Sequence, residues 1–293
     1  MTCSAFDARA DVAIDARRGD AYYAAHWAST GVAAVGALLI DRWSEHAGGY
    51  DWDWFPGDLA IRAYFRDSAA AMSDSTLVLT LGLPLGFHAG AGADRGFGNA
   101  SLVYAEVQAS QVLLNAFVKH AVARPRPYTH SSLDHVRSYA EKTGIENYVS
   151  FYSGHTGSSF AAAISGAYLF SLRSPDPWAR RLAWGSEFAL ASTTATLRVV
   201  AGRHYVSDVL VGAVIGSGIG IAVPLLHGYR EPIENLHADL AAGAIGLSTG
   251  VAVGAVLTAL RIWDEELAES AAAIPLAPYA FEGGFGIASL GTF

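Results

Sequence analysis

The stretch "FYSGHTGSSF", residues 151–160, places a Ser-Gly-His triplet where a long run of small and apolar residues begins. A helix that starts near Ser153 presents unpaired backbone N–H groups and the positive end of its dipole to an anion. Gly154 lets the backbone approach an oxygen atom closely, and the Ser153 hydroxyl can donate a hydrogen bond to it. The stretch therefore predicts a helix start that binds an oxyanion.

The chain around this stretch is more apolar than an ordinary soluble domain. It has 293 residues, of which 52% are hydrophobic and 16% charged, and its mean hydropathy is +0.27. The formal charge of -8, with no basic stripe, excludes nucleic acid as a partner. Cys3 is the one cysteine, so a disulfide framework is excluded, and the mixed charges of residues 1–20 predict no cleavable signal peptide. We expect a membrane protein.

Seven runs have the length of a membrane helix, which needs roughly 20 mostly apolar residues. Four are clean apolar runs without a formal charge, and three have more polar content; in chain order the seven are 21–40, 75–93, 101–118, 156–172, 182–200, 209–226 and 240–260. An Ala-rich soluble bundle is the alternative, but soluble helices show a polar face and 240–260 has no charge on any face. The runs predict an all-α, polytopic membrane bundle in one domain, 1–293, with catalytic helices at 101–228 and a flexible or short-strand tail at 278–293.

The reactive polar residues fall at the ends of these runs. In an up-and-down bundle, odd-numbered helices end on the face where even-numbered helices begin. By this alternation one face receives the ends of the third and fifth runs and the starts of the fourth and sixth. The residues predicted to meet there are Lys119, Arg126, Ser153, Gly154, His155, Arg198, His204 and Asp208.

Three of these residues are cations, and they suit a phosphoryl group. Lys119, Arg126 and Arg198 would balance its charge in the transition state, and arginine can bind two oxygens at once. The cations and the helix start at Ser153 together predict a phosphate-binding site.

The histidines suit two separate catalytic roles. His204 and Asp208 are four residues apart and share a helix face, so the carboxylate can hold the imidazole in the tautomer that leaves a nucleophilic nitrogen. His155 is then the general acid for the leaving oxygen, because an imidazole titrates near neutral pH. Each feature alone is common in structural roles, and the combination predicts a phosphohistidine route.

The same residues form three recognisable motifs. "KHAVARPRP" at 119–127 is similar to KxxxxxxRP, "YSGH" at 152–155 resembles PSGH, and "LRVVAGRHYVSD" at 197–208 resembles SRxxxxxHxxxD. These are the signatures of the superfamily of type 2 phosphatidic acid phosphatases, bacterial acid phosphatases and vanadium haloperoxidases. Tyr152 stands where the pattern has proline and Leu197 where it has serine, so we expect tuned rather than absent activity.

The resemblance implies a six-helix core, to which the last run adds a C-terminal helix. Within the superfamily, the chain is most similar to the branch of membrane lipid phosphatases. This resemblance implies metal-independent hydrolysis of a lipid phosphate or isoprenyl diphosphate, without a cofactor and with vanadate as an inhibitor that mimics phosphate. In this reading His204 is the nucleophile, His155 the acid, and Lys119, Arg126, Ser153, Gly154 and Arg198 hold the phosphate.

The arginines of the connecting loops indicate orientation. The face opposite the site has short connections with Arg9, Arg17, Arg18, Arg95, Arg173, Arg180, Arg181 and Arg230. Positive loops stay in the cytoplasm, so the site is expected to face the periplasm or exterior of a cell membrane, such as the bacterial inner membrane. The bilayer and a membrane lipid are the expected partners.

Other functions use the same residues. A vanadate-dependent haloperoxidase would hold vanadate in this pocket, a non-specific acid phosphatase would use it for soluble esters, and a transporter or scaffold would have lost catalysis. A metal site built on His130 and His135 is not expected, because their spacing puts them on different helix faces and no carboxylate cluster accompanies them. Arg124 and Arg203 stay outside the predicted phosphate set.

Overall fold

The computed structural model describes residues 20–43, 51, 55–92, 94–260, 277–281 and 284–288. Cys3, residues 1–19 and the end of the predicted tail lie outside the described residues. The described elements, in chain order, are α2 (Asp20–Trp43), α3 (Pro56–Leu59), α4 (Asp67–Gly90), α5 (Arg95–Val122), η1 (Pro127–His130), α6 (Asp134–Thr143), η2 (Gly144–Tyr148), α7 (Gly154–Arg173), α8 (Pro177–Val200), α9 (Val206–Leu226), α10 (Leu236–Ala259), β1 (Ala277–Phe281) and β2 (Gly284–Ala288).

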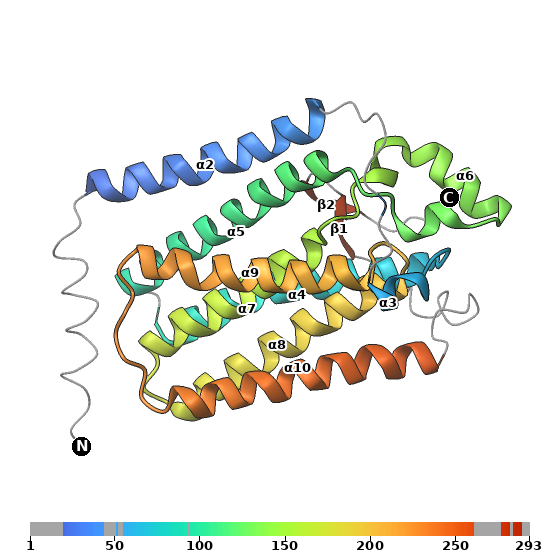
Figure 1. Cartoon of the computed structure of the whole chain (residues 1–293). Helices are drawn as coiled ribbons and strands as arrows, with labels where there is room; N and C mark the ends of the chain where they lie inside the picture. The colour runs from blue at the N-terminus through green and yellow to red at the C-terminus, as the bar shows by residue number, and fades with distance from the viewer. Residues whose placement is uncertain are drawn as a thin grey trace, which may run out of the picture.

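The long helices form an up-and-down bundle, which confirms the predicted all-α class (Figure 1). Each of the seven predicted runs coincides with most of one long helix. Helices α7 and α9 pack along each other, α2 packs along α5 on one side of the bundle, and α10 packs along α8 on the other. Strands β1 and β2 pair in antiparallel register from Ala277 opposite Ala288, and β1 contacts α4.

Glycines let the paired helices touch backbone to backbone. A Cβ atom added to Gly216 of α9 would lie 2.1 Å from the carbonyl oxygen of Gly157 in α7. A Cβ atom on Gly246 of α10 would lie 2.0 Å from the carbonyl oxygen of Gly185 in α8. Small residues at such contacts are typical of helix packing in lipid, where close van der Waals contact drives association.

The outer helices have the surface of a membrane protein. Among the described residues, α4, α9 and α10 are long and apolar enough to cross a membrane, and Ala24–Ile40 of α2 is a shorter apolar helix segment. Large apolar side chains such as Val214 and Ile245 are exposed, as expected for contact with lipid.

Helices α5, α7 and α8 have 28, 20 and 24 residues, enough to cross the bilayer, although their composition is more polar. Their polar side chains, including Gln111, Ser165 and Glu187, are buried inside the bundle. The burial of these side chains explains the more polar composition of the three helices, because polar groups are tolerated against protein and are costly against lipid.

The alternation of the helices creates two ends. The motif end is where α5 and α8 finish and where α7 and α9 begin; the distal end is where α4, α7 and α9 finish and where α5, α8 and α10 begin. At the distal end Arg180 Nε donates to Asp239 Oδ2 at 2.9 Å, and Arg173 donates to Asp94 Oδ1 at 2.8 Å and to the His88 carbonyl at 3.0 Å. These contacts fasten α8 to α10, and they fasten the end of α7 to the end of α4 and the start of α5.

Candidate active site

The Ser-Gly-His triplet begins α7, as the sequence predicts. Ser153 is the N-cap residue, and its hydroxyl oxygen accepts from the Thr156 N–H at 3.4 Å and from the Thr156 hydroxyl at 3.0 Å. An oxygen that accepts these bonds still has its own proton to donate to a ligand. Gly154 has no room for a side chain, because a Cβ atom would lie 2.5 Å from Asn115 Oδ1. The helix start is therefore pressed against α5.

Two amides of α5 fix this helix start, and sequence reasoning missed both. Asn115 Nδ2 donates to the Tyr152 carbonyl at 2.8 Å, and the Tyr152 hydroxyl donates to Gln111 Oε1 at 3.4 Å. Burial raises the pKa of Tyr152 to about 12, so the phenol is neutral. The tyrosine in the place of the motif's proline thus anchors the turn to α5. The sequence signal was the spacing of Gln111, Asn115 and Lys119, which are four residues apart on one helix face.

His204 lies in the connection between α8 and α9 and is fully buried. Its Nδ1 lies 2.7 Å from the carbonyl oxygen of Ser150. A carbonyl oxygen only accepts, so Nδ1 carries the hydrogen and the lone pair of the neutral ring is on Nε2. Asp208 Oδ2 lies 3.9 Å from Nδ1, too far for a hydrogen bond. The Ser150 carbonyl, and not the Asp208 carboxylate as the sequence suggested, directly selects the tautomer.

Asp208 instead holds the loops around His204. Its carboxylate accepts from Arg124 Nη1 at 2.5 Å, from the Ser150 hydroxyl at 2.5 Å and from the Tyr205 N–H at 2.9 Å. The Ser153 N–H donates to the Asp208 carbonyl at 3.1 Å, which joins the start of α7 to the start of α9. Asp208 therefore positions the segment that carries Ser150 relative to the one that carries His204.

Arg124 completes this buried network. Its Nη2 donates to Asp58 Oδ2 of α3 at 3.0 Å, and its guanidinium lies over the Tyr205 ring at 3.9 Å. Asp58 also accepts from the Ser207 N–H at 3.0 Å. Two carboxylates compensate the arginine charge, so Arg124 links α3 to α9. It belongs to the structural support of the site, consistent with its exclusion from the predicted phosphate set.

A second carboxylate, Asp74 of α4, joins His155 to Arg198. His155 Nε2 donates to Asp74 Oδ1 at 2.7 Å, and Arg198 Nη1 lies 3.5 Å from the same oxygen. Arg198 Nη1 also donates to Ser73 Oγ at 3.2 Å. Asp74 lies in no motif, and sequence reasoning missed it. The contacts bring the proposed acid and one proposed phosphate ligand to the same carboxylate.

The remaining two cations are also buried at the motif end. Arg126 Nε donates to the Glu146 carbonyl at 2.7 Å, and its Nη1 donates to the Arg203 carbonyl at 3.0 Å. Lys119 is 9% exposed and lies on α5 one turn after Asn115, the residue that contacts Gly154. All eight predicted residues therefore lie at the motif end, where three cations and a helix start concentrate positive charge.

The two histidines that the sequence analysis rejected as a metal pair have different surroundings. His130 Nε2 forms a hydrogen bond of 3.0 Å with the Tyr205 hydroxyl, whereas the His135 ring packs against Phe65. Burial, together with the nearby positive charge of Arg62, lowers the pKa of His130 below its usual value. His130 is therefore neutral near pH 7 and supports the Tyr205 loop.

Fold and site define a helical membrane protein with a cationic, histidine-containing site at one end of its bundle. Residues 100–232 match the family model of the PAP2 superfamily, and this range holds all three motifs and all eight predicted site residues. Over this range the chain is similar to the PAP2 superfamily, and this similarity supports a phosphatase-type activity. No curated protein and no solved structure gives a significant match to the sequence. Helices α2, α4 and α10, and with them Asp74, lie outside the matched range.

Proposed function

We propose that the protein is an integral membrane phosphatase that hydrolyses a lipid phosphate or an isoprenyl diphosphate through a phosphohistidine on His204. The observation that carries the proposal is the hydrogen bond of 2.7 Å between His204 Nδ1 and the Ser150 carbonyl. It puts the lone pair of the neutral ring on Nε2, the nitrogen that attacks phosphorus.

In the first step His204 Nε2 forms a bond to phosphorus, and the bond from phosphorus to the leaving oxygen breaks. His155 gives its proton to that oxygen as general acid. Asp74, hydrogen-bonded to His155 Nε2, positions the ring for this transfer. The leaving group is the lipid alcohol of a monoester or the lipid monophosphate of a diphosphate.

In the second step water attacks the phosphohistidine. His155, now neutral, takes a proton from the water, the P–N bond breaks, and inorganic phosphate leaves. His204 returns to its starting tautomer because the Ser150 carbonyl keeps the hydrogen on Nδ1. The second step thus regenerates both histidines.

Positive groups of the protein stabilise the transferring phosphoryl group without a catalytic metal ion. Lys119, Arg126 and Arg198 supply the charge, and the α7 start supplies N–H groups and the Ser153 hydroxyl. The α7 start, Arg126 and Arg198 are held in place before substrate binds by their contacts with Asn115, the Glu146 carbonyl and Asp74, respectively. Pre-positioned donors of this kind stabilise a transition state without reorganising first.

A lipid substrate suits the surroundings of the site. The connections at the motif end expose large apolar side chains: Leu59, Tyr64, Leu133, Ile145 and Tyr148. Such side chains favour contact with the bilayer surface, where lipid head groups lie. The arginines of the distal end, including Arg173, Arg180 and Arg230, favour a cytoplasmic position for that end, and in our proposal the motif end faces the periplasm or exterior.

The test is a substrate panel on the purified protein in detergent with a chelator present. The panel contains phosphatidate, an isoprenyl diphosphate, a soluble aryl phosphate, and bromide with peroxide and vanadate. We expect release of inorganic phosphate from a lipid substrate and inhibition by vanadate. Preference for the aryl phosphate would contradict the lipid assignment, bromide oxidation would indicate a haloperoxidase, and a requirement for added divalent metal would refute the mechanism.

A further inference from the structure

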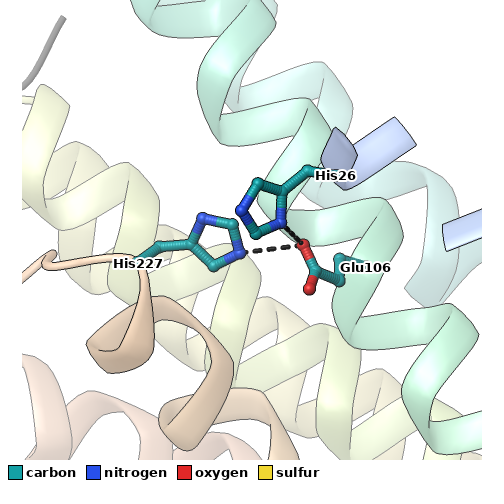
Figure 2. Close-up of side chains that lie close together, drawn as sticks. All are labelled: His26, Glu106 and His227. Atoms are coloured by element: carbon teal, nitrogen blue, oxygen red, sulfur yellow. Dashed lines mark hydrogen bonds and ion pairs between the residues drawn. The ribbon is translucent and has the colours of Figure 1, made fainter. Parts of the chain in front are cut away.

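Three potential metal ligands meet away from the motif end. His26 of α2, Glu106 of α5 and His227, which directly follows α9, point their side chains toward one another (Figure 2). Glu106 Oε2 lies 2.9 Å from His26 Nδ1 and 2.8 Å from His227 Nε2. All three candidate ligand atoms lie within 4.8 Å of one another. Residues from three separate helices therefore present two imidazole nitrogens and one carboxylate to a single point.

This ligand set matches the preferences of zinc. Two histidines and a glutamate are a common protein ligand set for Zn²⁺, with the fourth position taken by water. Zinc bonds of about 2.0–2.2 Å in a tetrahedron put neighbouring ligand atoms about 3.3 Å apart. The two N–O distances to Glu106 are about half an ångström shorter, so the side chains would need to move apart slightly around an ion. His26 and Glu106 have 27% and 21% of their side chains exposed, which gives them room to adjust.

A fourth residue orients one of the ligands. The Tyr22 hydroxyl lies 2.5 Å from His227 Nδ1, the ring nitrogen that does not face Glu106. Metal-binding histidines usually use their second nitrogen in a hydrogen bond that fixes the tautomer. With an ion bound, His227 Nδ1 would donate its hydrogen to the Tyr22 hydroxyl, and the lone pair of Nε2 would face the ion. The arrangement thus has the supporting contact that a ligand histidine requires.

The cluster is separate from the catalytic residues. His227 ends α9 and Asp208 lies at its start, and their separation along the helix axis is about 28 Å at about 1.5 Å per residue. His26 also lies outside the PAP2 match, whereas Glu106 and His227 lie within it. The cluster therefore connects a helix outside the matched domain to two helices inside it.

We propose that His26, Glu106 and His227 bind a divalent transition-metal ion, with zinc the best fit, and that this ion fastens α2 to the bundle. Helix α2 packs mainly along α5 at the side of the bundle (Figure 1), so a ligand bond to His227 adds a link to α9. The role is structural, and the proposal does not depend on the phosphatase activity.

The test uses the full chain, purified in detergent without a polyhistidine tag and incubated with zinc before dialysis. Elemental analysis should find about one zinc ion per chain. His26→Ala, His227→Ala and Glu106→Gln should each lose that ion, whereas the control His237→Ala, at an exposed histidine of α10, should keep it. Glu106→Gln keeps the size and polarity of the side chain, so its elution as a single species in size exclusion separates loss of metal from loss of fold.

Thermal unfolding gives a second readout. Zinc in about hundredfold excess over its Kd should raise the Tm of the wild-type chain by about 5 °C and leave the Tm of Glu106→Gln unchanged. If the wild-type chain retains no zinc, or if all three variants retain as much as wild type, the site does not exist and the three residues form only a hydrogen-bonded cluster.

Discussion

The motif end and the distal end of the bundle both collect histidines and carboxylates, but they do so in different ways. At the motif end His204 and Asp208 are four residues apart and fully buried, and backbone groups such as the Ser150 carbonyl hold them. At the distal end Glu106 meets residues that are 80 and 121 positions away, and side chains make the contacts. The first arrangement is rigid and suits catalysis, whereas the second can adjust around an ion.

The difference is also one of charge. Around His155 the nearby cations outnumber the carboxylates, since Asp74 faces Arg198 and the buried Lys119 and Arg126 lie at the same end. The distal cluster has one carboxylate between two imidazoles and suits a cation. The motif end thus favours an anionic ligand, and the distal cluster favours a cation.

The largest effect is expected from His204→Ala. Removal of the nucleophile should lower kcat by about 10⁴-fold or more, because the remaining groups bind the phosphate without forming the P–N bond. The matched control is His135→Ala, an exposed histidine at the same end, which should keep full activity. Phosphate release measures both, and equal activity of the two variants would contradict the assignment.

Arg198→Ala should have the next largest effect. Loss of one charged donor to the transferring phosphoryl group costs about 10²–10³-fold in kcat. Arg198→Lys keeps the positive charge but lacks the planar guanidinium that binds two oxygens, so it should recover part of the lost activity. The measurement is steady-state kinetics with a lipid substrate, and an effect confined to KM would show that Arg198 binds the ground state and the transition state equally.

Asp74→Asn is expected to have a smaller effect on catalysis. Loss of a charged hydrogen bond to His155 should lower kcat by about 10- to 100-fold, since such bonds contribute about 1.5–3 kcal/mol. Asp67→Asn, in the exposed first turn of the same helix, is the matched control. A changed pH profile in the first variant alone would show that Asp74 acts through His155.

Chelation should have the smallest effect on catalysis and a clear effect on stability. A chelator is expected to change the initial rate by less than about twofold, because the proposed metal lies about 28 Å from the motif end. It should lower the Tm of the wild-type chain and leave that of His26→Ala unchanged. Parallel loss of rate and Tm in the wild-type chain would show that the two ends are not independent.

The fold and the motif end were largely readable from the sequence. The apolar runs predict the helices because a membrane helix needs both length and low charge, and alternation of the runs then predicts which ends meet. The spacing of His204 and Asp208 could not show that a backbone carbonyl accepts from Nδ1. Every residue has a backbone carbonyl, so the sequence does not mark which of them faces the ring. Asp74 was missed because one carboxylate near the start of a span has no spacing to mark it.

The distal cluster could not be predicted from spacing at all. His26, Glu106 and His227 come together only because α2 packs along α5 and α5 lies against α9. The sequence analysis considered His130 with His135, which are close in the chain, and expected no metal site. Contacts between helices distant in sequence depend on packing geometry, and that information is present only in the folded structure.

The central claim, that His204 carries the phosphoryl group, is tested most directly by trapping the intermediate. The protein is mixed with a lipid phosphate, quenched in alkali within the first turnover, and digested for mass spectrometry. The account predicts a base-stable, acid-labile phosphoryl group on the peptide that contains His204, and none in His204→Ala. Phosphate release at the normal rate without a phosphorylated histidine would contradict the claim, and so would a phosphoryl group on another residue.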